Sequence, residues 1–559
     1  MTIGSISSRE RNSAADLRPA WLRWVVPSVG DLIFVALVGV LAFTALSVRL
    51  LGDAGIGWHI RTGQIILATH AIPRVDPFSS ASSAMPGQPW FAWEWLYDVI
   101  VGWLESTAGL NGVVLFTALV IAIVFAWTFR MLLRRGTNVF VAIVLLLLAA
   151  SAAMIHFLAR PHVVTWLFTM AWFWILESSE KSCGAPDFEP LAASEANPRR
   201  GWSLWLLPPL MLVWVNLHGG FLLGFVLLGI YWCSAAWQWF RLKEDRFDDA
   251  LRRIRAGWLV RALTLTGVLS GLATLVNPYG FRLHVHIYRY LTNRFLMDHI
   301  DEFQSPNFHY VAQKCFAALL LLTLVGLTVK RRGAGQGRLS QALVVLFAVY
   351  SGLYASRNIP VSSLLLILVI GPWLSEAMAR LEERRLADRR FAARGVAPMQ
   401  FFERMGAIEF SLRGHLWSVA MVVFTCWIAA HGGNLGARQV MDADFDAKRF
   451  PVAAANYLEE QGVAGPLASP DYWGGYLIYR LYPRVRMVVD DRHDFYGEEF
   501  LKSYLKMVHV EPGWEDFLRQ HQAHCVLAPK DSALANILGE TTGWRAIYSD
   551  DVAVAFEAK

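Results

Sequence analysis

Eleven long apolar runs set the strongest limit on what this chain can fold into. They are centred near residues 41, 121, 147, 170, 210, 230, 267, 321, 347, 368 and 423. A helix of about 20 apolar residues spans the hydrocarbon core of a bilayer. Only 17% of the 559 residues are charged, whereas soluble domains carry roughly one quarter. The sequence therefore predicts an α-helical polytopic membrane protein with about eleven transmembrane helices.

Basic clusters alternate with these runs and predict their orientation. Cytoplasmic loops carry an excess of Lys and Arg, and every cluster falls on one side if the eleven spans are right and the N-terminus is cytoplasmic. The first run begins near Gly30 and is too long for a signal peptide. We therefore expect a multi-pass membrane protein with a cytoplasmic N-terminus, and we interpret it as a protein of a bacterial inner (plasma) membrane. The clusters are Arg9, Arg11, Arg18 and Arg23, "RMLLRR", "KSCG…NPRRG", "RLKEDRFDDALRRIR", "KRRGAGQGR" and "RLEERRLADRRFAARG".

The chain divides into three parts. We expect a cytoplasmic N-terminal segment over 1–29, a membrane domain over 30–432 and a small α/β domain over 433–559, outside the membrane in the periplasm. After Gly433 the apolar runs shorten to strand length and alternate with helical segments, which is typical of an α/β domain. The expected strands are "GPLASP", "RMVVDD", "HCVLAPK", "WRAIYSD" and "VAVAFEA".

The first outer loop, over 53–110, is expected to carry interfacial helices. Its segment "WFAWEWLYDVIVGWLESTAGLNG" contains Glu94, Asp98 and Glu105, so that it is amphipathic rather than fully apolar. Counting it as a span would place "RMLLRR" on the outer side, against the positive-inside rule.

Two acids in this loop are candidate catalytic residues. Asp53 follows the first run in "GDAGIGWHIRTG". It fits a helix N-cap as well as a carboxylate that takes a proton from a hydroxyl or binds a metal. Glu94 lies between Trp93 and Trp95, where it is either part of an interfacial anchor or a second acid.

Other outer helix ends carry His, Asn and Arg, which are candidates for binding a substrate or a donor phosphate. Arginine binds phosphate bidentately, although an interfacial arginine can also simply extend toward lipid headgroups. A lone His or Asn at such an end is often structural. The residues are His59, Arg160 and His162 in "ARPH", Asn216 and His218 in "NLHGG", Arg282, and Arg357 in "ASRN".

The C-terminal segment "VVDDRHDFY" is dense in charge. Such clusters at strand ends of α/β domains often bind ligands, but a solvated loop with Arg492 paired to an acid explains it as well. The Gly-Gly of "DYWGGY" is expected at a tight turn into a helix. No phosphate-binding glycine motif is present, and the five cysteines show neither disulfide nor zinc spacing.

Three features together resemble the GT-C superfamily of integral-membrane glycosyltransferases. They are "GDAGIGWH", the loop "IPRVDPFS…WFAWEW" and the order of the spans over roughly residues 30 to 430. The resemblance implies a polyprenyl-phosphate-linked sugar donor on the outer leaflet, Asp53 as the catalytic base, and Arg160, Arg282 and Arg357 at the donor phosphate. Many members carry an acid in the second outer loop, where this chain has "ARPH". That departure puts metal dependence in doubt and leaves His162 as the residue in the position of the missing acid.

The sequence thus predicts a membrane glycosyltransferase that transfers a sugar, with inversion, to a periplasmic acceptor. Its partners would be the lipid-linked sugar and the bilayer, with no nucleic acid. No cofactor is indicated except a divalent metal ion, which stays open. A transporter or flippase of a lipid-linked or anionic solute would use the same arginines without bond chemistry. A non-catalytic scaffold of the cell envelope is the third interpretation.

Overall fold

The computed structural model describes residues 21–80, 89–184, 202–242, 247–329, 338–387, 398–412 and 415–559. Most of the predicted N-terminal segment, with Arg9, Arg11 and Arg18, lies outside these residues. The same holds for "NPRRG", for most of "KRRGAGQGR" and for much of "RLADRRFAARG".

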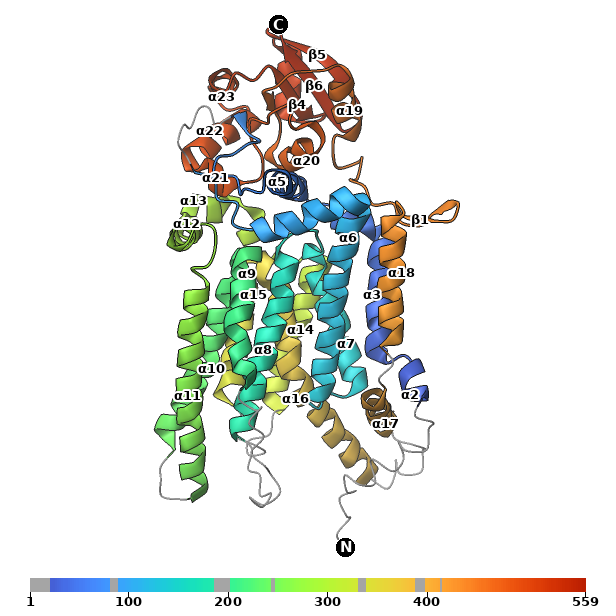
Figure 1. Ribbon diagram of the computed structural model, residues 1–559, viewed down its shortest axis with the longest axis vertical. Helices are drawn as coiled ribbons and strands as arrows, with labels where there is room; N and C mark the ends of the chain where they lie inside the picture. The colour runs from blue at the N-terminus through green and yellow to red at the C-terminus, as the bar shows by residue number, and fades with distance from the viewer. Residues whose placement is uncertain are drawn as a thin grey trace.

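Each of the eleven apolar runs falls on a helix, and these helices form one bundle (Figure 1). They are α3 (Val29–Phe43), α6 (Trp95–Arg134), α7 (Val139–Ala153), α8 (His162–Gly184), α9 (Leu207–Leu217), α10 (Leu222–Arg241), α11 (Phe247–Ala273), α14 (Val311–Val329), α15 (Leu339–Tyr354), α16 (Ile359–Ala387) and α18 (Leu416–Ala430).

Seven of these helices are long and apolar enough to cross a membrane: α3, α6, α7, α10, α11, α14 and α16. α9, α15 and α18 are shorter apolar helices, and α8 contains Glu177, Glu180 and Lys181 toward its C-terminal end. Length and composition thus support a multi-pass membrane protein, while the full count of eleven spans stays a prediction.

The two ends of the bundle differ in what they carry (Figure 1). One end holds α5 (Gly55–Thr69), α12 (Phe281–Thr292), α13 (Arg294–His299) and the C-terminal domain, whereas α2 (Leu22–Val25) and α17 (Pro398–Ser411) lie at the other. We call the first the outer end. Short helices complete the connections: α4 (Leu46–Leu50), η2 (Met154–His156), η4 (Trp202–Leu206), η5 (Gly219–Phe221), η6 (Asp301–Phe303) and η7 (Ser356–Asn358).

Helix α6 changes direction at Gly109, whose φ of 61° and ψ of −161° are not helical. A positive φ is readily adopted only by glycine. The part of α6 before Gly109 lies across the outer end of the bundle, and the part after it runs along the bundle axis (Figure 1). The segment predicted as an interfacial helix is therefore set at an angle to the span that follows it.

Helix α5 is packed between α6 and the C-terminal helix α20 (Asp471–Leu481). On one side, a Cβ on Gly63 would collide with the carbonyl of Asp98 in α6. On the other side, a Cβ on Gly57 would collide with the carbonyl of Gly475 in α20. Both contacts bring backbone against backbone, which only glycine permits. The glycines of "GDAGIGWHIRTG" thus allow one helix to join the two parts of the molecule.

The C-terminal domain has the predicted α/β character. Its four-stranded sheet has the order β3-β4-β6-β5, with β3 and β4 parallel and the other pairs antiparallel. A separate ribbon of β1 (Asn434–Leu435) and β2 (Arg438–Gln439) precedes it. The elements are α19 (Val452–Glu460), β3 (Leu467–Ala468), α21 (His493–Tyr496), α22 (Glu498–Val508), α23 (Trp514–Gln520), β4 (Cys525–Pro529), α24 (Ala533–Glu540), β5 (Trp544–Ser549) and β6 (Ala553–Ala558).

Two local predictions were wrong. The Gly-Gly of "DYWGGY" lies inside α20 and not at a turn. Gly475 allows the close contact with the start of α5 at Ala54 and Gly55, and Gly474 allows a close contact with Asp490. "RMVVDD" is not a regular strand; Met487 forms single bridges to Ser79 and to Leu467. The backbone around Met487 is shared between the sheet edge and the first outer loop, with Ser80 donating to its carbonyl.

The contact between α5 and α20 gives a first prediction. Gly57→Ala should lower the free energy of unfolding by about 1–3 kcal/mol, the usual cost of overpacking, because the new Cβ collides with α20. Gly539→Ala is the matched control, since a Cβ there meets no atom within 4 Å. Thermal unfolding of both purified variants checks this, and equal melting temperatures would contradict the close packing.

Candidate functional site

Arg160 lies at the centre of the polar groups at the outer end. It follows η2 and precedes α8, and its side chain is 25% exposed. One terminal nitrogen, Nη1, lies 3.0 Å from Asp53 Oδ2, and the other, Nη2, lies 3.5 Å from Asp491 Oδ2. The guanidinium thus joins a carboxylate from the first outer loop to one from the C-terminal domain. These two carboxylates further raise the pKa of Arg160 against the opposing effect of burial.

Asp53 makes two contacts, one at the start of α5 and one with Arg160. Its Oδ1 accepts a hydrogen bond from the backbone N–H of Gly55, 2.8 Å away, at the start of α5. The N-cap residue itself is Ala54, so Asp53 supports the helix start from one position further out. Its other oxygen faces Arg160. Capping and ion pairing therefore use different oxygens of one carboxylate.

Gly55 leaves the space in which these three side chains meet. A Cβ on Gly55 would lie 2.5 Å from Asp491 Oδ2, 3.0 Å from Arg160 Nη2 and 3.0 Å from Asp53 Oδ1. A side chain at residue 55 would therefore displace Asp491 and Arg160 from these positions. Asp53, Arg160 and Asp491 are called the acid–arginine triad below.

A second group of side chains surrounds Glu94, directly before α6. Its Oε2 lies 3.7 Å from His59 Nε2, and its Oε1 lies 3.5 Å from His218 Nε2. His59 Nδ1 is bonded to Asp98 Oδ1 at 2.5 Å. His218 Nδ1 accepts from the N–H of Gly220, so that its Nε2 carries the hydrogen and points at Glu94.

This second group is uncharged near neutral pH. Burial is the largest cause that raises the pKa of Glu94 to about 8, and burial likewise lowers the pKa of His218 to about 3. The pKa of His59, which is completely buried, is also lowered well below its ordinary value, first by burial and then by Arg160. Glu94 is therefore a protonated acid between two neutral imidazoles, suited to donating a proton.

Arg357 brings a second guanidinium to the same region. It lies on η7, 28% exposed, 3.3 Å from Glu302 and over the ring of Phe303. Burial raises the pKa of Glu302, but Arg357 and then Arg160 lower it to a net value of about 2. Arg160 and Arg357 also both act on the pKa of Glu94. The two arginines therefore belong to one electrostatic site.

The remaining predicted residues lie at different places. His162 Nε2 is 2.8 Å from the carbonyl of His156, beside Arg160 in the chain. Asn216 donates to the carbonyls of Leu212 and Val276 and accepts from the indole of Trp95. Its amide therefore links α9 by hydrogen bonds to the segment after α11 and to the start of α6.

Arg282 lies on the exposed side of α12, and the structure records no hydrogen bond or ion pair of its guanidinium with the described residues. It is not among the groups that act on the pKa of Arg160 or Glu94.

Asp491 is the residue that the sequence reasoning missed. It belongs to "VVDDRHDFY", which is not a solvated loop. Arg492 is buried and bonds Asp490 on one side and Asp76 of the first outer loop on the other, at 2.6 and 2.7 Å. Its guanidinium lies over aromatic rings that include Trp90, 5.0 Å away. This buried pairing, predicted only as an exposed one, fixes the neighbouring Asp491 beside Arg160.

The side chains present do not fit a divalent metal ion. Within the described ranges, no three His, Cys, Asp or Glu side chains are placed to hold one. Asp53 and Asp491 both face a guanidinium, which supplies the positive charge at this position. His218 presents a hydrogen rather than a lone pair to Glu94. We therefore derive no step through a metal.

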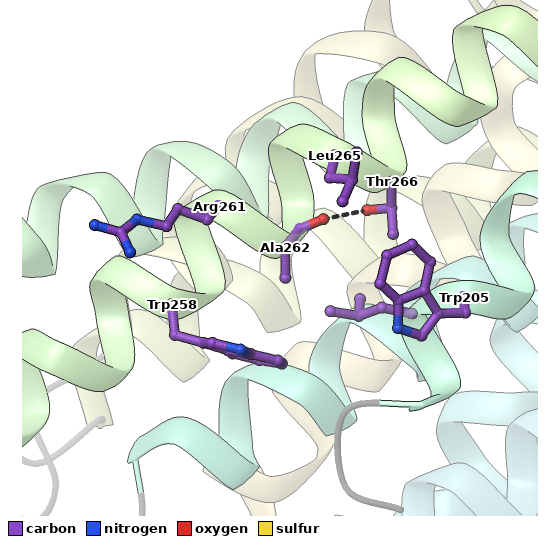
Figure 2. Close-up of a pocket in the computed structure, with 7 residues that line it drawn as sticks. Trp205, Trp258, Arg261, Ala262, Leu265 and Thr266 are labelled. Carbon is purple, nitrogen blue, oxygen red and sulfur yellow. Dashed lines mark hydrogen bonds between the residues drawn. The ribbon is translucent and has the colours of Figure 1, made fainter.

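A groove of about 200 Å³ lies elsewhere, between η4 and α11 (Figure 2). Trp205, Trp258 and Arg261 line it together with aliphatic side chains and Thr266. It contains no carboxylate or imidazole, so its chemistry differs from that of the outer end.

We compared the sequence and the structure of the chain with those of known proteins. No protein-family model and no curated protein sequence match the chain. The apo oligosaccharyltransferase of Archaeoglobus fulgidus is 10% identical, with a TM-score of 0.55 over 95% of this chain and 74% of that one. The same enzyme tethered to an acceptor peptide with the NVT sequon is 11% identical, with a TM-score of 0.52 and the same coverage. ArnT from Cupriavidus metallidurans, in the apo state, is 14% identical, covering 94% of this chain and 97% of that one, with a TM-score of 0.48.

The oligosaccharyltransferase is a GT-C glycosyltransferase, so the chain has a GT-C-like fold. The predicted fold class, a polytopic helical membrane protein with a small C-terminal α/β region, is confirmed. At 10% and 11% identity the likeness concerns the fold alone.

The neutral state of Glu94 predicts how stability changes with pH. Because folding raises the pKa of Glu94 from 4.5 to about 8, its contribution is fully present below pH 4.5 and is lost as pH rises through 8. Glu94→Gln imitates the protonated form and should reduce the fall in melting temperature between pH 6 and pH 8.5. Glu515→Gln, at an exposed position, serves as the control. Parallel profiles of wild type and Glu94→Gln would show that Glu94 is ionised throughout.

Proposed function

We propose that this chain is a membrane glycosyltransferase that moves a sugar from a polyprenyl-phosphate donor to a periplasmic acceptor. The observation that carries the proposal is the meeting of two partly exposed arginines with carboxylates at the outer end of a GT-C-like bundle. Cations for a leaving phosphate and acids for proton transfer are the groups that such a reaction needs.

Arg160 and Arg357 are the donor-phosphate residues in this proposal. Both lie at the outer end and retain exposed guanidinium surface, 25% and 28%. A leaving phosphate gains negative charge as its bond to the sugar breaks, and fixed guanidinium groups stabilise that charge. Arg160 is held by two carboxylates and Arg357 by Glu302, so both are positioned before substrate arrives.

The acceptor hydroxyl must lose a proton as it attacks the anomeric carbon. The partly exposed carboxylate of Asp53 is the group that the sequence predicts for this step, and it lies against Arg160. A single displacement would invert the configuration at the anomeric carbon. Glu94, as a neutral acid beside His59 and His218, is suited to donating a hydrogen bond to donor or acceptor oxygen.

Transport of a lipid-linked solute is the alternative use of the same arginines. Carriers commonly place their substrate site near the middle of the bilayer. The acid–arginine triad instead lies at the outer end, against the C-terminal domain. That position favours chemistry on the outer side over passage through the bundle.

Removing the carboxylate of Asp53 tests the reaction. Asp53→Asn should abolish sugar transfer, a loss of about 100-fold or more, while the protein still inserts and folds. The assay uses purified protein in lipid nanodiscs, a panel of radiolabelled polyprenyl-phosphate sugars as donors and a periplasmic extract as the source of acceptors. Transfer is the amount of radiolabel that moves from the lipid to the extract. Full activity of Asp53→Asn would exclude it from the reaction.

Arg357 tests the donor site separately. Arg357→Ala should raise the KM for the polyprenyl-phosphate donor at least about tenfold, because a charge-assisted contact to the phosphate is lost. Arg438→Ala, on the exposed β2 strand, is the control at the same end of the molecule. An unchanged donor KM in Arg357→Ala would remove Arg357 from the phosphate site.

A further inference from the structure

The segment from Asp490 to Asp494 connects the C-terminal domain to the outer end of the bundle. Each of its five residues contacts a different partner. Two contacts lie within the C-terminal domain: Asp490 with Tyr496, and His493 with Asp471. The others reach the outer end of the bundle: Asp491 with Trp58 and Arg160, Arg492 with Asp76, and Asp494 with His286 of α12. Four of these contacts hold the segment, and Asp491 is the residue that they present to the triad.

Asp491 and Asp53 bind the two ends of one guanidinium, but they are held differently. Asp53 is 3.0 Å from Arg160 and also accepts a backbone N–H. Asp491 is 3.5 Å from Arg160, and its other oxygen accepts the indole N–H of Trp58 at 3.0 Å. Arg160 therefore lies closer to Asp53 than to Asp491.

The charges around Asp491 act in opposite directions. Arg160 and His493 favour its ionised form, whereas Asp53 and Asp490 disfavour it. Burial is the largest cause and, with the two acids, raises the pKa of Asp491 to about 7. A base works best when its pKa is near the working pH, so Asp491 exchanges a proton there readily. Its side chain is still 14% exposed.

We propose that Asp491, supplied by the C-terminal domain, is the carboxylate that takes the proton from the acceptor hydroxyl, while Asp53 holds Arg160 in place. This rests on the proposed function and deepens it, and it moves the role of base from Asp53, which the sequence predicted, to Asp491. The acceptor oxygen forms the new bond to the anomeric carbon, and its proton passes to Asp491. The bond from that carbon to the phosphate oxygen breaks, and its electron pair leaves on the polyprenyl phosphate, beside Arg160.

Docking of the C-terminal domain is then part of catalysis. Without it, Arg160 would face Asp53 alone, and Asp491 would be missing from the site. Trp58 and Gly55 of α5 both lie against Asp491, so α5 takes part in the same docking contact.

The test is the pH dependence of sugar transfer by the full-length protein in nanodiscs, with the polyprenyl-phosphate sugar that the wild type turns over. Wild-type activity should rise with pH through about 7. Asp491→Asn should lose about 100-fold or more in kcat and retain no pH-dependent rise near 7. Asp551→Asn, fully exposed in the same domain, should match the wild type.

Two further variants separate a proton acceptor from a structural residue. Trp58→Phe removes a hydrogen bond to the anion of Asp491, so the rise in activity should move to higher pH. Asp53→Asn removes a neighbouring negative charge, so its residual activity should rise at lower pH than the wild type. A merely structural Asp491 would produce neither shift.

The outcomes distinguish the two proposals. An active wild type together with an Asp491→Asn variant that keeps its rate, or keeps the rise near pH 7, overturns the assignment of Asp491 alone. A wild type that turns over no polyprenyl-phosphate sugar overturns the proposed function itself.

Discussion

The ion contacts of Arg160 are the interaction on which the outer end of this protein depends. A guanidinium that loses part of its hydration is stabilised by carboxylates around it. Here one carboxylate comes from residue 53 and the other from residue 491. Removing either would leave Arg160 with a carboxylate from only one of the two parts, so the bundle and the C-terminal domain are linked through the site itself. A polar cluster of this kind is expensive to keep, which is the usual mark of a functional position.

The packing around α5 serves this contact. Gly57 and Gly63 allow α5 to lie against α20 and α6 with backbone contact on both sides, and Gly55 leaves room for the triad. The buried pairing of Arg492 with Asp490 and Asp76 then fixes the C-terminal segment over the first outer loop. Three glycines and one buried arginine thus set the position of Asp491 beside Asp53.

Parts of this arrangement could be predicted from the sequence, and parts could not. The apolar runs predicted the helices of the bundle because each run must bury or span as a helix. Asp53 and Arg160 were each predicted at an outer helix end, but the contact between them was not. Asp491 could not be placed, since a contact across 331 residues leaves no periodic signal. The charged segment around Asp491 fitted a solvated loop as well as it fitted a ligand-binding cluster. The glycine pair of α20 was misplaced because the contacts of Gly475 with the start of α5 and of Gly474 with Asp490 leave no signal in the local sequence.

The central claim is that Arg160 and Arg357 bind the phosphate of a lipid-linked sugar at the outer end of the bundle. A cryo-electron microscopy map of the protein in nanodiscs containing a polyprenyl phosphate tests it most directly. The account predicts phosphate density within hydrogen-bond distance, about 2.7–3.0 Å, of at least one of these two guanidinium groups. Phosphate density at another surface, or none at a saturating amount of lipid, would contradict it.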